Sequence, residues 1–241
     1  MSRDELYAGE QAPDAPFEFN DAVASVFPDM LCRSIPGYAE SLAAIASLAR
    51  RHVTPGSRCY DLGASLGAAT LAIRHNIRVD GCRIIAVDNA PAMVRRCREA
   101  IAADGAATPV DVLQADVCAV PIENASLVVM NYTLQFLPRD ERPGLLERIH
   151  AGLADGGVFV LSEKVVHDDP RIEALLVDLH HEHKRRHDYS ALEISRKRAA
   201  LENVLVPDSV QTHLERLRNA GFRHAGVWLR WFNFVSLVAI R

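Results

Sequence analysis

The stretch from Tyr60 to Thr70, Tyr-Asp-Leu-Gly-Ala-Ser-Leu-Gly-Ala-Ala-Thr, constrains the fold of this chain more than any other. Residues 58–62 have the apolar character of a buried strand, and a run of small residues follows them directly. Gly63 and Gly67 stand where a backbone can turn sharply and where a ligand can approach without meeting a Cβ atom. The sequence therefore predicts a strand, a tight turn and the start of a helix, with a binding site at the turn.

The residue before the glycines indicates the kind of ligand. A dinucleotide-binding turn has three glycines arranged over a pyrophosphate at a helix N-terminus. This chain has two glycines there, and the acidic Asp61 precedes them. The pattern favours S-adenosylmethionine over NAD, although a glycine pair after a strand also occurs as a plain tight turn.

Polar side chains end the next predicted strands in turn. Asp88 follows a strand at residues 82–87, about 20 residues beyond the glycine turn, where an acid can accept both ribose hydroxyls. The alternative is a cap for the helix at residues 91–103, for which Asn89 is better placed. Asp116 follows a strand at residues 109–115 and suits the exocyclic amine of adenine; the alternative is a plain loop acid. Asn131 ends a strand at residues 127–130 and points at the crevice where strand carboxyl ends carry ligands.

The rest of the pattern completes one sheet. A fifth strand is expected at residues 158–161, and the apolar runs 225–231 and 234–240 are close enough to form an antiparallel hairpin at the sheet edge. Helices are expected at residues 39–52, 66–76, 91–103, 142–151 and 209–220. The fold class is therefore α/β: a doubly wound, seven-stranded, mostly parallel sheet, a Rossmann fold of the class I methyltransferase kind.

Three regions are expected along the chain. Residues 1–16, with prolines, glycine and acids, predict a flexible arm that buries no core. Residues 17–241 form a single domain, since 241 residues suit one large α/β unit. Residues 165–206 are a long, charged helical insertion in that domain. Tyr38, after Pro-Gly, can close over a bound carboxylate or pack against the helix that follows it.

Composition excludes several classes of protein. The net charge of −4 argues against a protein that holds nucleic acid through its own field. Five scattered cysteines without a CxxC pair suggest neither a disulfide framework nor a zinc cluster, and the expected location is the cytoplasm. The N-terminal residues form no apolar leader, and no run approaches the roughly 18 apolar residues of a membrane helix. We therefore expect a protein that is neither exported nor embedded in a membrane. The basic residues are 24 arginines and three lysines, a bias that we attribute to the base composition of the genome.

The histidines of the insertion predict no metal site. His180, His183 and His187 share one helix face, but Lys184 and the two arginines after it oppose a cation. A solvated face or an anion site is the preferred interpretation. Two nucleic-acid chemistries lack their motifs: Asn131 is not followed by Pro-Pro-Tyr, and no Pro-Cys pair occurs.

These motifs, taken together, resemble one family. They are Val26-Phe-Pro-Asp-Met30, Arg33-Ser-Ile-Pro-Gly-Tyr38, the stretch from Asp61 to Thr70, Val87-Asp-Asn-Ala-Pro-Ala-Met93, Glu123-Asn-Ala-Ser-Leu127, Asn131-Tyr-Thr-Leu-Gln-Phe-Leu137, Leu161-Ser-Glu-Lys164, Glu193-Ile-Ser-Arg-Lys-Arg198 and Leu201-Glu-Asn-Val204. Over residues 17–241 the chain resembles the carboxy-S-adenosyl-L-methionine synthases, insertion included. Ala64 departs from the cysteine expected there, which matters little because backbone contacts dominate that turn.

The resemblance implies an enzyme with a methyltransferase fold that does not transfer a methyl group. It implies that S-adenosylmethionine and prephenate give carboxy-S-adenosyl-L-methionine, phenylpyruvate and water, and that a partner enzyme uses the product to carboxymethylate the wobble uridine of tRNA. No direct tRNA binding and no membrane are required. The ligand positions that it implies are Tyr38, Gly63, Ala64, Ser65, Asp88, Asn89, Asp116, Val117, Asn131 and Arg198.

The resemblance further implies that Arg198 grips the carboxylate of the product, because a guanidinium can bind it through two parallel hydrogen bonds. It favours a homodimer with the insertion at or near the interface. No catalytic residue is identified, and hydroxide expelled from prephenate can take the proton. An ordinary methyltransferase acting on a small acceptor and a non-catalytic binding protein remain the alternatives.

Overall fold

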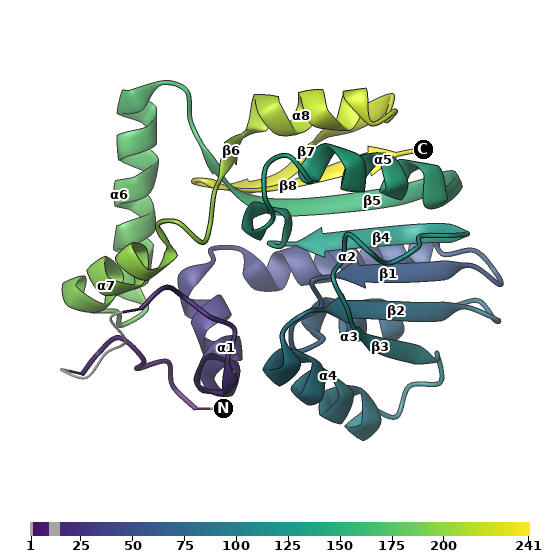
Figure 1. The fold of residues 1–241 in the computed structure, drawn as a ribbon, viewed down its shortest axis with the longest axis horizontal. Helices are drawn as coiled ribbons and strands as arrows, with labels where there is room; N and C mark the ends of the chain where they lie inside the picture. The colour runs from purple at the N-terminus through teal and green to yellow at the C-terminus, as the bar shows by residue number, and fades with distance from the viewer. Residues whose placement is uncertain (1, 10–14) are drawn as a thin grey trace.

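A single mixed sheet forms the centre of the molecule (Figure 1). The computed structural model describes residues 2–9 and 15–241. Seven strands follow the order β3-β2-β1-β4-β5-β8-β7, and β6 pairs with β5 off this path. Strands β1 to β5 run parallel, and β8 and β7 add the antiparallel hairpin. The strands are β1 (Arg58–Leu62), β2 (Arg83–Asp88), β3 (Val110–Gln114), β4 (Ala125–Asn131), β5 (Leu153–Val166), β6 (Asp208–Ser209), β7 (His224–Trp231) and β8 (Phe234–Ile240). The predicted fold class is confirmed.

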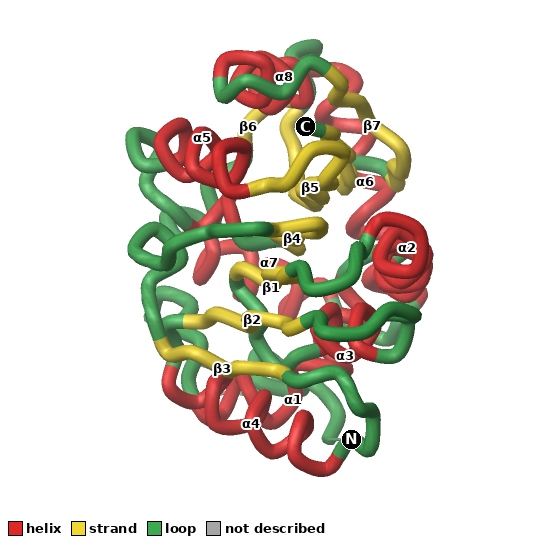
Figure 2. Tube along the Cα trace, turned by 90° about the vertical axis from the view of Figure 1, so that its right-hand side faces the viewer, coloured by secondary structure: helices red, strands yellow, loops and turns green. Residues whose placement is uncertain are grey.

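The central strands are apolar on both faces, because helices cover both sides of the sheet. The helices are α1 (Asp21–Ser34), α2 (Tyr38–His52), α3 (Ala68–Arg74), α4 (Pro91–Ala103), α5 (Arg142–Gly152), α6 (Pro170–Arg186), α7 (Ala191–Leu201) and α8 (Val210–Asn219), with a 3-10 turn η1 (Leu134–Phe136). Cys59, Leu127 and Val129 pack with α2 and α3. Tyr60, Val128 and Met130 pack with α5 and α8. Figure 2 shows α2 and α3 on one side of these strands and α5 on the other.

Two strands differ from the expectation. β5 was expected at residues 158–161 but runs from Leu153 to Val166, because β8 pairs with it as far as Lys164. The two-residue β6 was not predicted, since it forms only by pairing Asp208 with Val165 at the end of the insertion. Long-range pairing set both, and such pairing leaves little local signal in the sequence.

The insertion forms two helices beside the sheet (Figure 1). Asp169 caps α6 by accepting the amides of Arg171 and Ile172. Ser190 and Glu193 form a reciprocal capping box at the start of α7. Both helices therefore begin where their own sequence satisfies the free amides.

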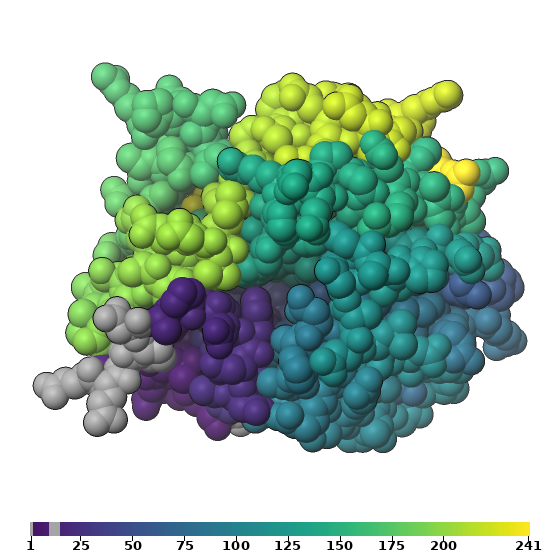
Figure 3. Space-filling view, in the orientation of Figure 1, coloured from purple at the N-terminus to yellow at the C-terminus, as the bar shows by residue number. Residues whose placement is uncertain are grey.

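The N-terminal segment is docked on these helices. Asp4 and Tyr7 are buried, at 2% and 5% exposure, and the Tyr189 hydroxyl donates to the Asp4 carboxylate at 2.5 Å. The amide of Phe17 donates to the carbonyl of Ala200 at 3.0 Å, and Figure 3 shows the purple N-terminal part of the chain against the yellow-green α7. The expectation that residues 1–16 bury nothing is wrong for residues 4 and 7, while residues 1 and 10–14 lie outside the described part of the chain.

None of the helices in the described ranges is both long and apolar enough to span a bilayer.

A buried guanidinium fixes the end of the insertion. Arg142 is fully buried and donates to the carbonyls of Gln135, Leu137 and Val206. Its Nη1 also pairs with the Asp208 carboxylate at 2.5 Å. Burial alone would raise the pKa of Asp208. The hydrogen bonds and positive charges of Arg216 and Arg142 outweigh burial, so the pKa lies below its usual value. One side chain thus joins η1, α5 and the strand that follows the insertion.

We expect Arg142→Met to lower the free energy of unfolding by about 3–5 kcal/mol, because it leaves buried carbonyls and a buried carboxylate short of a donor. Arg139→Met is the matched control: Arg139 contacts the same carboxylate at 3.2 Å but its side chain is 62% exposed, so the loss should stay below about 1 kcal/mol. Urea unfolding of the three proteins measures both. Equal losses for the two variants would contradict the role given to Arg142.

Candidate functional site

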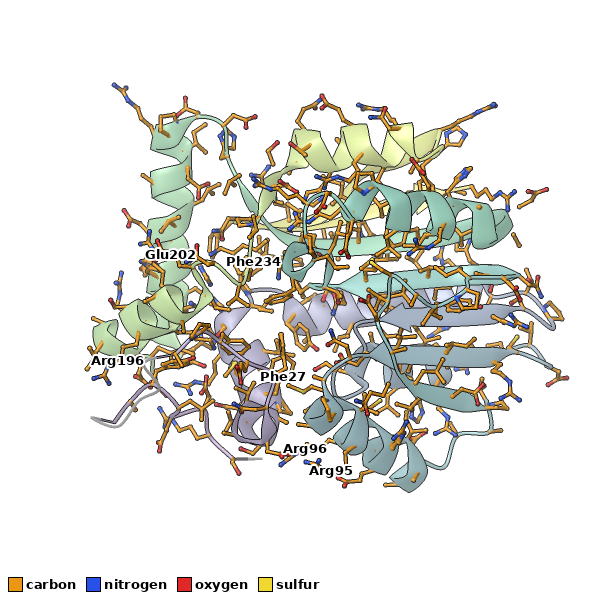
Figure 4. The ribbon with its side chains drawn as sticks, in the orientation of Figure 1. Phe27, Arg95, Arg96, Arg196, Glu202 and Phe234 are labelled. Atoms are coloured by element: carbon orange, nitrogen blue, oxygen red, sulfur yellow. The ribbon has the colours of Figure 1, made fainter. Side chains whose placement is uncertain are left out.

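A cavity of about 520 Å³ opens at the carboxyl ends of the parallel strands. The strand order reverses between β1 and β4, and such a switch point is where open α/β sheets bind ligands. Aromatic side chains contribute to its walls, and Figure 4 labels two of them, Phe27 from α1 and Phe234 from β8. The cavity is therefore enclosed by the sheet on one side and by the N-terminal and inserted helices on the other.

The turn after β1 lies against this cavity. Gly63 has φ of +85°, and a Cβ on it would run into the side chain of Thr133, so glycine is required. Gly63, Ala64 and Ser65 all line the cavity. Ser65 and Tyr132 also line it with positive φ, at 52° and 63°, a conformation that costs energy for these residue types. Backbone strain of this kind is typical of ligand sites.

Asp88 organises the same turn from the end of β2. Its carboxylate accepts the amide of Ser65 at 2.8 Å and the amide of Ala90 at 2.9 Å. Burial raises the pKa of Asp88, and these amide hydrogen bonds oppose that shift. Neither Asp88 nor Asn89 caps α4 with its side chain, because the N-cap is Ala90. Both residues line the cavity, so the structure leaves them available to a ligand.

Asp61 is a site residue that the list of expected ligand positions lacks. It is 1% exposed and accepts the Thr70 hydroxyl at 2.6 Å through Oδ2, while Oδ1 has no hydrogen-bond partner among the described residues. Burial raises its pKa to about 6. A buried carboxylate oxygen without a partner, at a cavity wall, suits a cationic ligand group. Its place before the glycines was the signal in the sequence.

The remaining expected positions on the sheet also meet here. Asp116, Val117 and Asn131 line the cavity from the ends of β3 and β4. Asn131 Oδ1 is buried and has no partner among the described residues, as at Asp61. These unpartnered oxygens, with the glycine cradle, fit an adenosyl amino acid, whose ammonium and hydroxyl groups are donors.

Tyr38 lines the cavity at the first residue of α2. Gly37 holds it there with φ of +73°, where a Cβ would meet the ring of Trp231. Burial raises the pKa of Tyr38. The Tyr38 hydroxyl therefore stays protonated and can donate a hydrogen bond.

Arg198 is the expected position that the structure does not bring to the cavity. It lies on α7 and is exposed, and the lining residues do not include it. Its neighbour Lys197 points inward instead and is 7% exposed. Within one copy of the chain, Arg198 therefore does not line the cavity, although its charge acts on Lys164, which does.

The cavity has a cationic half that the sequence analysis did not identify. Lys164, Lys184 and Lys197 line it, from β5, α6 and α7. They are the three lysines of the sequence, and the sequence analysis did not place them together. In the sequence, the one sign of a special role is that lysines are only three of the 27 basic residues. Only the fold shows that the three side chains line the same cavity.

His180 lies beside these lysines and does not form a solvated face. It is 5% exposed, and its Nε2 lies 2.9 Å from the carbonyl of Ser34, to which it donates. Burial, with charge from Lys184, lowers its pKa to about 2. Across residues 2–9 and 15–241, no group of three histidine, cysteine or acidic side chains is placed to hold a metal ion. All five cysteines are unpaired.

Comparisons with known proteins give the family. Residues 60–157 match the model of the methyltransferase domain. Carboxy-S-adenosyl-L-methionine synthase of Erwinia tasmaniensis is 55% identical over 240 residues, covering 100% of this chain and 98% of that protein. The synthase of Escherichia coli K12 is 53% identical over 239 residues, covering 99% and 97%.

Solved structures agree on the fold. An O-methyltransferase family protein from Burkholderia thailandensis superposes with a TM-score of 0.65 at 15% identity, covering 92% of this chain and 59% of that one. That likeness shows a methyltransferase fold and nothing about the substrate. The identity to the synthases over nearly their full length decides the family: the chain belongs to the carboxy-S-adenosyl-L-methionine synthases.

Proposed function

We propose that the chain converts S-adenosylmethionine and prephenate to carboxy-S-adenosyl-L-methionine, phenylpyruvate and water. The observation that carries this proposal is identity of 53–55% to synthases over essentially the whole chain. The match includes the helical insertion, which lies outside the general methyltransferase region at residues 60–157.

The proposed reaction balances without a protein base. Prephenate loses its ring carboxylate as carbon dioxide, and the freed electron pair makes the ring aromatic as the ring hydroxyl leaves as hydroxide. The hydroxide takes a proton from the sulfonium methyl group and becomes water. The carbon left with the electron pair attacks carbon dioxide and forms the new bond. The chain then contributes positioning and electrostatic stabilisation.

The cavity residues divide between the parts of S-adenosylmethionine. We propose that Asp88 accepts the ribose hydroxyls, with Asn89 beside it, and that Asp116 and Val117 receive the adenine. The turn at Gly63, Ala64 and Ser65 brings its backbone against the ligand. Asp61 and Asn131 present unpartnered oxygens, which suit the ammonium of the methionine part. Tyr38 can donate to a carboxylate.

The product is proposed to serve a separate enzyme that carboxymethylates the wobble uridine of tRNA. The net charge of −4 gives this chain no general field for tRNA, so no direct binding is proposed. Cytoplasmic location fits five unpaired cysteines.

A homodimer is proposed because the insertion carries exposed apolar side chains. Among the described residues, seven large hydrophobic side chains are exposed, and four lie at residues 165–206: Val166, Ile172, Leu175 and Leu192. Leu175 is 56% exposed, which favours burial against a second copy. Arg198 lies on the same inserted helices. We therefore propose that Arg198 binds the carboxylate of the product in the cavity of the partner subunit.

The function is tested by incubating the protein with S-adenosylmethionine and prephenate and analysing the products by mass spectrometry. The expected result is a cofactor heavier by one carboxyl group, with phenylpyruvate in equal amount. A methyltransferase would give S-adenosylhomocysteine when its acceptor is present. A binding protein would return both compounds unchanged, and either result would overturn the proposal.

We expect Asp88→Asn to weaken S-adenosylmethionine binding roughly tenfold or more, since each hydrogen bond to a charged group contributes about 1.5–3 kcal/mol. Calorimetry measures the affinity, and thermal unfolding checks that the turn at Ser65 survives the lost acceptor. Asp111→Asn is the control, because Asp111 pairs with the exposed Arg83 and does not line the cavity. Unchanged affinity in folded Asp88→Asn would refute the ribose role.

We expect Arg198→Leu to leave S-adenosylmethionine binding nearly intact and to weaken carboxy-S-adenosyl-L-methionine by about 2–4 kcal/mol, thirtyfold or more. Leu175→Glu should reduce the light-scattering mass from two chains to one and produce the same selective loss. Val227→Glu, exposed on β7 outside the insertion, is the control for the added charge. A monomeric wild type, or two affinities that fall together, would count against the shared site.

A further inference from the structure

All three lysines of the chain line one cavity. The chain has 27 basic residues, and the other 24 are arginines, none of which lines that cavity in the described structure. A lysine carries a compact charge on a flexible stem, whereas the wide, planar fork of arginine needs more room. The lysine cluster, defined as Lys164, Lys184 and Lys197, therefore has a local role in this cavity.

Each lysine is held in place by its own element. The amide of Lys164 donates to Gln135 Oε1 at 3.0 Å, and Lys164 pairs with Phe234 of β8. Lys184 comes from the last turn of α6. Lys197 comes from α7, and its Nζ lies 3.3 Å from Ser34 Oγ. The strand and the two inserted helices thus bring three lysine side chains to the cavity.

The cluster has more positive charge than the protein neutralises. Its one carboxylate within ion-pair distance, in the described ranges, is Asp4, 3.5 Å from Lys197 Nζ. That carboxylate is shared with the Tyr189 hydroxyl. Burial, then repulsion from Lys197 and Lys164, lowers the pKa of Lys184 to about 7. Burial lowers the pKa of Lys197 to about 8 in spite of Asp4. An anion bound at the cluster would relieve this repulsion.

Charge is separated along the cavity. The acids Asp61 and Asp88 come from β1 and β2, and Asp116 is the second residue after β3, where the adenosyl ligand is proposed to lie. The lysines come from β5 and the insertion. Asn131 pairs with Ser162 in the sheet, so Lys164 lies two residues past the level of Asn131. The second substrate then has a cationic end of the cavity beside the proposed cofactor.

We propose that the lysine cluster is the binding subsite for the keto-acid carboxylate of prephenate, the carboxylate that phenylpyruvate keeps. This inference rests on the proposed function and adds where the second substrate binds. Prephenate has two carboxylates, and the ring carboxylate must leave as carbon dioxide. Ammonium groups on the leaving carboxylate would stabilise the ground state and slow its loss, so the cations are expected to hold the other one. Aromatic side chains that line the cavity, such as Tyr132 and Phe234, can then contact the ring of prephenate.

The test uses Lys184→Met and Lys164→Met, because Lys197 also binds Asp4 and Ser34 and its loss can disturb folding. Prephenate and phenylpyruvate are titrated by calorimetry into full-length protein loaded with S-adenosylhomocysteine, which has no methyl group and cannot react. Both ligands should bind at least tenfold more weakly to each variant, and the KM for prephenate should rise by a similar factor. S-adenosylmethionine affinity should stay within twofold. Arg218→Met, on α8 and away from the cavity, is the control for a lost charge.

Four other results would contradict the lysine subsite, and they differ in whether the proposed function fails with it. If S-adenosylmethionine affinity falls with that of prephenate, the lysines hold the methionine carboxylate and the inference is wrong. If carboxy-S-adenosyl-L-methionine binds more weakly but phenylpyruvate does not, they read the transferred carboxyl group and the inference is also wrong. A wild type that makes product while both variants bind prephenate normally refutes the subsite alone. A wild type that neither reacts with nor binds prephenate refutes the proposed function, and the subsite with it.

Discussion

The buried guanidinium of Arg142 is the interaction on which the position of the helical insertion depends. It joins residues that lie 66 positions apart in the chain, and it donates to the carbonyls of Gln135 in η1, Leu137 just after η1 and Val206 before β6. The carbonyl of Gln135 also accepts the amide of Val206 at 2.9 Å, and the Gln135 side chain accepts the amide of Lys164. These contacts hold the end of the insertion, where β6 pairs with β5, against the sheet. They also fix Gln135 and Lys164, which line the cavity.

A second constraint is the cost of burying charge. The cavity places an unpartnered carboxylate oxygen of Asp61 at one end and the lysine cluster at the other, and each loses hydration that protein groups replace only in part. Such groups persist in folded proteins where a ligand completes them. The arrangement suits a cationic cofactor beside an anionic substrate. The general methyltransferase sheet supplies the first end, and the insertion supplies most of the second.

The same insertion lines the cavity with one surface and exposes apolar side chains on another. Its inner surface contributes Lys184, Lys197 and His180 to the cavity, and its outer surface exposes Leu175 and its apolar neighbours. The docked N-terminal segment adds Asp4 to the inner surface. In the homodimer proposed above, the second copy would cover the outer surface, and the insertion would couple dimer formation to the shape of the substrate site.

The sequence by itself determined the sheet, the glycine turn and the polar residue at the end of each parallel strand. Gly63, Asp88 and Asn131 could be placed because strand, turn and helix signals are local, and because the parallel strands of such a sheet all end at the same edge. The length of β5 could not be predicted, since the distant β8 pairs along it.

Only the tertiary structure decided that Lys164, Lys184 and Lys197 meet, that Asp4 joins them, and that Arg198 is exposed and does not line the cavity. Lys197 and Arg198 are adjacent on one helix, and the direction of each side chain depends on how α7 packs against α1, α6 and the N-terminal segment. No local pattern encodes that packing: α7 has charged residues on several faces, so the side that is buried follows from its partners.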